Sequence, residues 1–323
     1  AWILLGAGAV VLFFAWLAAP TVTPEGRVVT ATEAPALFET IERLRASLDA
    51  APIQRVVLTD DLNAAAHQSG PLGLPWPMRQ TLVLGVPALA VLRPPEAAAV
   101  IAHELGQFSR RHGMFGHWIY RTRAMWLALA HPAHADDSPY ERAVQWFASS
   151  FAPWFGRYAF ALSRQCEYEA DLDAAQASSP RELAQALLAL DIAARRIDGW
   201  TQGAQYQMRR LHPQAPDDRW SAMLAGLGRE AFQSDEIDTS RRRTAAAEDT
   251  HPSIVERAAA LNVSWVALQD RLPSASECAG SVWLGPRWTS ELAAMDAAWR
   301  RLQHRVWCAD SIHLTRLARR MEV

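Results

Sequence analysis

His103 and Glu104 are the two residues whose types and spacing most clearly suggest chemistry. They begin the stretch His103-Glu104-Leu105-Gly106-Gln107, which differs from the pattern His-Glu-x-x-His only at its last residue. In the full pattern, histidines four residues apart lie on one helical face and bind one Zn²⁺, while the glutamate acts as general base on the metal-bound water. A glutamine amide is a poor zinc ligand beside imidazole, thiolate or carboxylate. The stretch therefore predicts a zinc site with one weakened ligand.

The sequence around this stretch predicts the helix that the site needs, from Pro94 to Gly113. The proline pair at its start suits a first helical turn, where a missing N–H costs nothing. The basic residues at 110–112 suit the negative end of the helix dipole, and Gly113 suits a left-handed cap. His112 lies nine residues after His103 and therefore on the opposite face, so it does not replace the missing ligand.

A second predicted helix carries the acidic residues Glu167, Glu169 and Asp171. Glu167 and Asp171 are four residues apart and share a face, whereas Glu169 points elsewhere. Glu167 could supply a further metal ligand, and Asp171 could hold a ligand imidazole in place. An acidic pair on a helix is more often a solvated face, so this interpretation depends on other segments.

Three motifs in one order carry a specific resemblance: His103-Glu104, then Arg164-x-x-Glu167-x-x-Ala170-Asp171, then His251-Pro252-Ser253 followed by Glu256-Arg257. The chain resembles the HtpX-like and CAAX-prenyl-protease-like membrane zinc metallopeptidases of the gluzincin type. The resemblance covers the chain from Val57 to Leu261.

The resemblance implies a role for each matching position. The three metal ligands of the family fall on His103, Gln107 and Glu167. The general base falls on Glu104, the aspartate after the last ligand on Asp171, and the histidine that steadies the transition state on His251. Asn63 and Ala64 match a segment that borders the substrate-binding edge strand, to which an extended peptide could add as a further strand.

Two functions follow as expectations. The first is a membrane-anchored zinc metalloendopeptidase that binds one zinc ion, weakly because of Gln107, and cuts protein or peptide in extended form. The second is a pseudopeptidase that keeps the groove, binds extended polypeptide segments as a chaperone or adaptor, and cuts nothing. His251 could also be an ordinary helix-start residue near the surface.

Composition excludes some classes of function. The 323 residues carry a formal net charge of −2, and no basic run is long enough to indicate nucleic-acid binding. All 32 basic residues are arginine, which fits a composition bias. The three cysteines, Cys166, Cys278 and Cys308, have neither Cys-x-x-Cys spacing nor an even number, so no disulfide framework is required.

An apolar segment from Trp2 to Ala19 approaches the length of a membrane-spanning helix. A signal peptide is the alternative, although its apolar region is usually shorter. We expect a membrane anchor at residues 1–20 and a location at a bacterial inner membrane. A second apolar stretch, Ala143 to Leu162, could be a buried, an interfacial or a membrane-spanning helix, and Pro153 and Arg157 favour the first two.

The predicted fold is α+β and mostly α: a zincin-like catalytic domain with a small sheet at 21–270, an N-terminal membrane helix, and a helical extension at 271–323. Strands are expected at 54–59 and 81–86, and an extended piece after Asn63. Further helices are expected at 32–48, 118–130, 139–177 with a kink at Pro153, 180–199, 250–261 and 289–321. The charged segment 234–249 is expected to be exposed or mobile.

Overall fold

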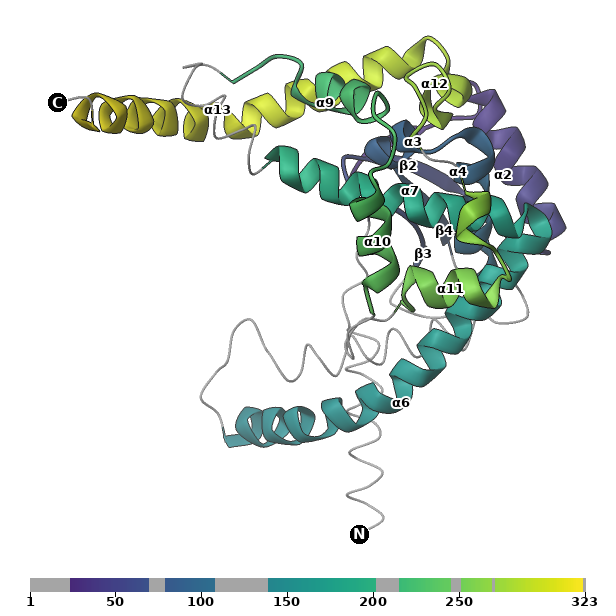
Figure 1. Cartoon of the computed structure of the whole chain (residues 1–323). Coiled ribbons are helices and arrows are strands. Elements are labelled where there is room, and N and C mark those ends of the chain that lie inside the picture. Colours follow the sequence, from purple (N-terminus) through teal and green to yellow (C-terminus); the bar gives the residue numbers. More distant parts are fainter. Residues whose placement is uncertain are drawn as a thin grey trace.

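The computed structural model describes residues 24–69, 79–107, 139–201, 215–244, 251–268 and 271–321. These residues form a small sheet covered by helices, from which the two longest helices project in different directions (Figure 1). The prediction of a mostly helical α+β chain is confirmed. The predicted membrane helix at 1–20, the helix at 118–130 and the cap at Gly113 lie outside the described residues.

The sheet has four strands in the order β1-β2-β4-β3. Their bounds are Arg27–Val29 for β1, Arg55–Thr59 for β2, Ala64–Ser69 for β3 and Arg79–Gly85 for β4. β2 and β4 pair in parallel, whereas β1 and β3 flank them in antiparallel directions. β2 and β4 are short runs of buried apolar residues, as expected for central strands covered on both faces. β3 is left as an edge strand.

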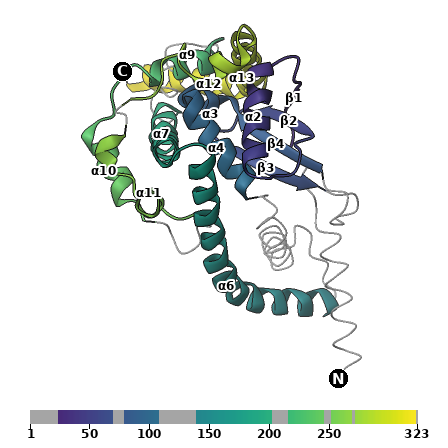
Figure 2. The same cartoon turned by 90° about the vertical axis from the view of Figure 1, so that its right-hand side faces the viewer.

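Helix α4, Pro94–Gly106, is the centre of the fold. It contacts α2, α6, α7, α12 and strand β3, and Figure 2 shows it between α7 and the sheet. Its interior from Ala97 to Ala102 is buried on all sides. The helix begins as the proline pair predicts, and Glu96 accepts a hydrogen bond from the Arg93 backbone N–H at 2.7 Å. A helix that is apolar around its whole circumference must lie in the core.

The remaining helices cover the sheet and α4. They are α2 (Pro35–Ser47), α3 (Val86–Val91), α6 (Pro139–Ala177), α7 (Pro180–Gly199), α9 (Arg219–Leu227), α10 (Ser234–Arg242), α11 (Ile254–Ala260), the 3₁₀ turn η3 (Trp265–Ala267), α12 (Ala279–Leu284) and α13 (Arg287–Met321). α12 contacts α2 and α3. The division of the chain at residue 270 stays a prediction.

The stretch from 234 to 242, expected to be exposed or mobile, is mostly exposed or half-buried, and it is also helical. It forms α10, which begins with a capping box between Gln233 and Glu236. Arg196 on α7 donates to both carboxylate oxygens of Glu236 at 2.7 Å, and the fully buried Ser240 donates to Asp191 at 2.8 Å. These bonds between helices hold a charged helix that has little apolar surface of its own.

The first half of α6 is more exposed than a core helix. Trp146 is 73% exposed, Trp154 is 54% exposed and Phe147 is also exposed, so the buried alternative for residues 143–162 is wrong. Pro153 lies inside the helix, as expected. Within the part of the chain that the structure describes, no helix has the length and apolar character needed to cross a membrane.

Gly85 fixes the turn that leads into the edge strand. Its N–H donates to the carbonyl of Asn63 at 2.8 Å, and a Cβ atom there would lie 1.7 Å from the carbonyl oxygen of Asp61. We expect Gly85→Ala to lower the free energy of unfolding by about 1–3 kcal/mol, because the backbone must shift to relieve this overlap.

Gly226→Ala in α9 is the matched control, since a Cβ atom at that position meets nothing within 4 Å. This helix-interior change is expected to raise the free energy of unfolding by about 0.5–1 kcal/mol. Urea unfolding followed by circular dichroism measures both variants. Equal effects of the two changes would contradict the role given to Gly85.

Candidate metal and active site

Three segments that are far apart in the sequence meet at the end of α4. His103, Glu104 and Gln107 come from its last turn and C-cap, Glu167 and Asp171 from the second half of α6, and His251 from the residues before α11. α4 and α6 pack closely at Gly106, where a Cβ atom would lie 3.3 Å from the Cβ of Asp173, which is a tight contact. The structure thus brings together all six of these predicted side chains.

Three side chains, those of His103, Gln107 and Glu167, form the corners of a small triangle. Nε2 of His103 lies 3.5 Å from Oε2 of Glu167, and Nε2 of Gln107 lies 3.1 Å from both His103 Nε2 and Glu167 Oε1. Two ligands of one tetrahedral zinc ion lie about 3.4 Å apart, given metal–ligand distances near 2.1 Å. The carboxamide of Gln107 therefore occupies the corner where the motif would have an imidazole.

The imidazole of His103 is fixed by partners on its other side. Its Nδ1 donates to Oδ1 of Asp171 at 2.9 Å, which turns Nε2 toward Glu167 and Gln107. Asp171 is held in turn by Arg257, whose Nε donates to Oδ2 at 2.8 Å and whose Nη2 donates to Oδ1. Nη2 of Arg257 also lies 3.3 Å from His103 Nδ1, but that nitrogen already carries the proton given to Asp171, so the contact adds no hydrogen bond.

The charges of this cluster shift the pKa of each member. Burial and the charge of Arg257 lower the pKa of His103, but hydrogen bonds to Asp171 and Glu167 and the charge of Glu104 outweigh them and raise it to about 9. Burial raises the pKa of Glu167, yet bonds from His103 and His251 hold it well below its usual range. A metal ion must therefore displace a proton from His103.

The protonation state of His103 decides which hydrogen bonds the Gln107 amide makes. The Gln107 amide N–H donates to Glu167 Oε1 whichever form His103 takes, and it donates to His103 as well when Nε2 is unprotonated. In the protonated form, the Nε2–H of His103 faces Oε2 of Glu167 instead. In both forms the carboxamide contributes hydrogen-bond donors where a ligand would contribute a lone pair.

Glu104 faces the edge strand. Its Oε2 accepts a hydrogen bond from the Ala66 N–H on β3 at 3.1 Å, and burial is the largest cause of the raised pKa of its carboxyl group. Alternate residues of an edge strand point the same way, so Ala64 and Ala66 both present their backbone groups away from β4. The N–H of Ala64 is taken by the side chain of its neighbour Asn63, at 2.9 Å.

The residue of the edge strand that contacts Glu104 lies two positions after Ala64, and the substrate-binding role of Asn63 and Ala64 stays a prediction. Asn63 is exposed and Ala64 begins β3, but Ala66 is the residue that contacts Glu104. Sequence reasoning missed Ala66, because an alanine carries no chemical signal and only the pairing register shows which backbone groups face outward.

Two ion pairs tie α11 to α6 and bring His251 into place. Arg164 pairs with Glu256 at 2.6 Å, and Asp171 pairs with Arg257. His251, 64% exposed, lies with Nδ1 2.7 Å from Glu167 Oε2. The alternative of a helix-start residue near the surface agrees with this exposure and with the position of His251 just before α11, but the side chain also contacts Glu167. Arg257 was named in the sequence only as part of a motif, although its buried position makes it central to the cluster.

The residues present fit a divalent metal ion with two good ligands and one weak one. His103 and Glu167 offer an imidazole nitrogen and a carboxylate at a suitable spacing, whereas Gln107 offers a carbonyl oxygen only after its amide turns over. Among the residues that the structure describes, no three His, Cys, Asp or Glu side chains form a group that could hold a metal ion.

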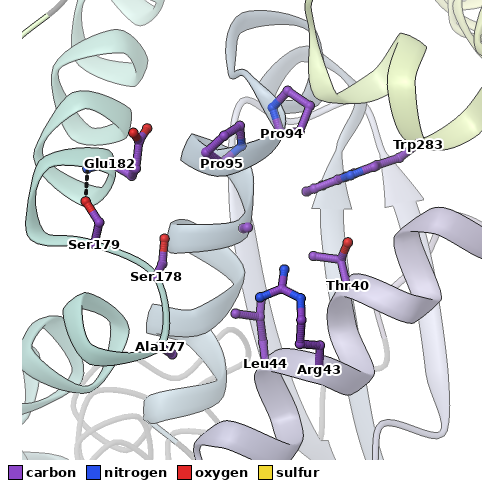
Figure 3. Close-up of a pocket in the computed structure, with 11 residues that line it drawn as sticks. Thr40, Arg43, Leu44, Pro94, Pro95, Ala177, Ser178, Ser179, Glu182 and Trp283 are labelled. Atoms are coloured by element: carbon purple, nitrogen blue, oxygen red, sulfur yellow. Dashed lines mark hydrogen bonds between the residues drawn. The ribbon is translucent and has the colours of Figure 1, made fainter.

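A cavity of about 410 Å³ lies elsewhere, beside the first turn of α4. Figure 3 shows Arg43 and Thr40 of α2, Trp283 of α12 and the start of α7 around it. It contains none of the predicted site residues, which lie on or near the last turn of α4.

Replacement of Arg257 tests how the cluster is held. We expect Arg257→Met to lower the free energy of unfolding by about 3–5 kcal/mol, because the carboxylate of Asp171 would stay buried without its partner. Arg242→Met is the control, since Arg242 is 82% exposed and lies 3.7 Å from Asp238. Urea unfolding should show a change below about 1 kcal/mol for the control. Similar losses in both variants would contradict this account.

Comparison with known families agrees with the site. The model of peptidase family M48 matches residues 34–264, more than half of the chain and a range that includes all of the predicted site residues. No curated protein matches the chain. Peptidases of this family are typically zinc-dependent. The resemblance inferred from the three motifs is confirmed at the level of the family: the chain belongs to peptidase family M48.

Proposed function

We propose that this chain is a membrane-associated metalloendopeptidase that binds polypeptide in extended form along β3 and whose turnover is kept low by Gln107. The observation that supports this most directly is the triangle of His103, Glu167 and Gln107, which adjoins the contact between Glu104 and the edge strand. Family membership supports the class of reaction, hydrolysis of a peptide bond.

The edge strand supplies the binding mode for the substrate. An added strand pairs through backbone hydrogen bonds, which explains a preference for extended and unfolded segments. The N–H of Ala66 is one donor for such a strand, and it is now bonded to Glu104. A substrate carbonyl that replaces Glu104 at this N–H would free the carboxylate beside the peptide bond to be cut.

Glu104 would then act as the general base, and His251 would act as a hydrogen-bond donor to the transition state. The raised pKa of Glu104 brings it nearer to neutrality, which improves a carboxylate as a general base toward water. His251 is exposed on the solvent side of Glu167 and can donate to an oxyanion that develops there. Zinc held by His103 and Glu167 would supply Lewis-acid activation of the water and of the carbonyl group.

The alternative is a pseudopeptidase that binds extended polypeptide without cutting it. The observation that favours it is the Gln107 amide, whose N–H groups bond to the atoms that would otherwise bind metal. In this alternative the edge strand keeps its role and the carboxylate of Glu104 serves only the β3 contact.

Restoring the motif separates the two functions. We expect Gln107→His to raise both metal occupancy and the rate of casein cleavage, by about 100-fold or more, because even partners of a ligand change metal affinity 10–100-fold. Adding Glu104→Gln to this variant should abolish the gain while metal binding remains, since the general base is lost.

Cleavage at equal rates by the parent chain and the Gln107→His variant would contradict the proposed effect of Gln107. If neither cuts casein, while both retain an unfolded protein on affinity beads, the pseudopeptidase function replaces the peptidase. The bead assay therefore runs beside the cleavage assay on the same preparations.

Membrane association is supported by the first half of α6 and by the apolar segment 2–19. Phe147, Phe151, Trp154 and Phe155 follow one side of the helix, and the ring centroid of Phe151 lies 5.3–6.0 Å from those of the other three. Exposed aromatic side chains on a helix are typical of the interface between lipid and water.

Fluorescence tests the contact of this helix with lipid. In vesicles that contain brominated lipids, we expect the full chain to show quenched tryptophan emission. The Trp146→Phe/Trp154→Phe variant should lose part of this quenched emission, and the rest should come from Trp2 and Trp16 of the apolar segment. Trp283→Phe/Trp288→Phe is the control, because both residues are buried in the body. An unchanged quenched part in the α6 variant would contradict lipid contact by this helix.

A further inference from the structure

The donor atoms at the site differ in hardness from those of a zinc peptidase, and this difference decides which ion they favour. The three corners of the triangle are one imidazole nitrogen, one carboxylate and one carboxamide. In the full motif, two of the three would be imidazoles. Gln107 thus replaces a borderline nitrogen donor with a hard oxygen donor or with none at all.

The carboxamide is already at the ligand corner, and its orientation must change before its oxygen can bind a cation. Its nitrogen lies 3.1 Å from both neighbouring side chains. A half-turn about the last side-chain torsion exchanges nitrogen and oxygen with little displacement, and that torsion has a broad energy profile. After the turn, the oxygen faces the centre of the triangle together with Nε2 of His103 and the carboxylate of Glu167.

The other two ligands are fixed in place for a cation. Asp171 orients the His103 ring, and Asp171 is itself held by Arg257, all three residues being buried. Glu167 is 7% exposed, and its carboxylate forms one corner of the triangle. A cation therefore meets a negative, rigid and mostly oxygen-lined corner of the protein.

We propose that Gln107 shifts the preference of this site from Zn²⁺ toward a harder divalent cation, for which Mn²⁺ is the probe. Carboxylate and carbonyl oxygens suit Mn²⁺, while the single imidazole retains an advantage over Mg²⁺ and Ca²⁺. The loss of the second imidazole removes more affinity for Zn²⁺ than for Mn²⁺. The inference rests on the metal site of the proposed function, but it does not require that a peptide be cut.

The test compares two metals in two proteins. Metal-free full-length chain and its Gln107→His variant are titrated with Mn²⁺, followed by the electron paramagnetic resonance signal of the free ion, and with Zn²⁺, followed by competition with a chromophoric chelator. We expect the ratio of the dissociation constants, Mn²⁺ over Zn²⁺, to be at least about tenfold lower in the parent chain, since a changed ligand alters affinity by that order.

A second variant tests the ligand atom itself. Gln107→Glu keeps an oxygen at the corner and adds a charge, so it should bind Mn²⁺ more tightly than the parent, whereas Gln107→Ala should bind it at least about tenfold more weakly. Circular dichroism confirms that each variant is folded before titration. Unchanged Mn²⁺ affinity in Gln107→Ala would show that the carboxamide is not a ligand and would overturn the proposal.

The remaining outcomes are equally decisive. Equal ratios in the parent chain and the Gln107→His variant overturn the proposal, as does a parent chain that binds neither ion. A lower ratio without any casein cleavage overturns the peptidase function alone and leaves the metal preference standing. Equal ratios with cleavage restored in Gln107→His overturn the metal preference alone.

Discussion

The hydrogen bond between His103 and Asp171 is the interaction on which the site depends. It joins α4 to α6, selects the ring nitrogen that faces the triangle, and places two ionisable side chains in contact in the interior. Buried charges are tolerated only when they are paired and hydrogen-bonded. Here Arg257 balances Asp171, and His103 lies between the carboxylates of Asp171 and Glu167, so α11 is required for a stable site as much as α4 and α6.

Gln107 changes the donor atoms that this cluster offers to a metal ion, but the positions of His103 and Glu167 still suit a shared ligand set. Because the Gln107 amide reaches the same corner as an imidazole would, the helices need not move to accommodate it. The amide N–H groups satisfy a carboxylate that would otherwise be buried without a partner on that side. Any cation that enters must replace these bonds and the proton on His103, which gives a physical reason for the low turnover that we propose.

The sequence predicted those parts of the structure that depend on spacing and periodicity within one helix or strand. Spacings of four residues placed His103 with Gln107 and Glu167 with Asp171, and the apolar strands and most helix bounds followed from periodicity. It did not predict what depends on pairing across the chain. The contact of Ala66 with Glu104 follows from strand register, and α10 forms because Arg196 and Asp191 lie opposite it. The exposure of Trp146 and Trp154 follows from where α6 leaves the body, which no local pattern encodes.

The length of α6 connects the two proposed properties of the chain, contact with a membrane and cleavage of a peptide bond. Trp154 and Glu167 lie on the same helix, 13 positions apart in the sequence, which is about 20 Å at 1.5 Å per residue. If Trp154 lies in the lipid interface, the carboxylate of Glu167 is therefore at most about 20 Å from that interface. The peptide bonds within reach would then belong to extended segments that lie close to the membrane surface. Pro153 bends or weakens the helix only on the aromatic side of this span, so the part between Trp154 and Glu167 can transmit position as one rigid element.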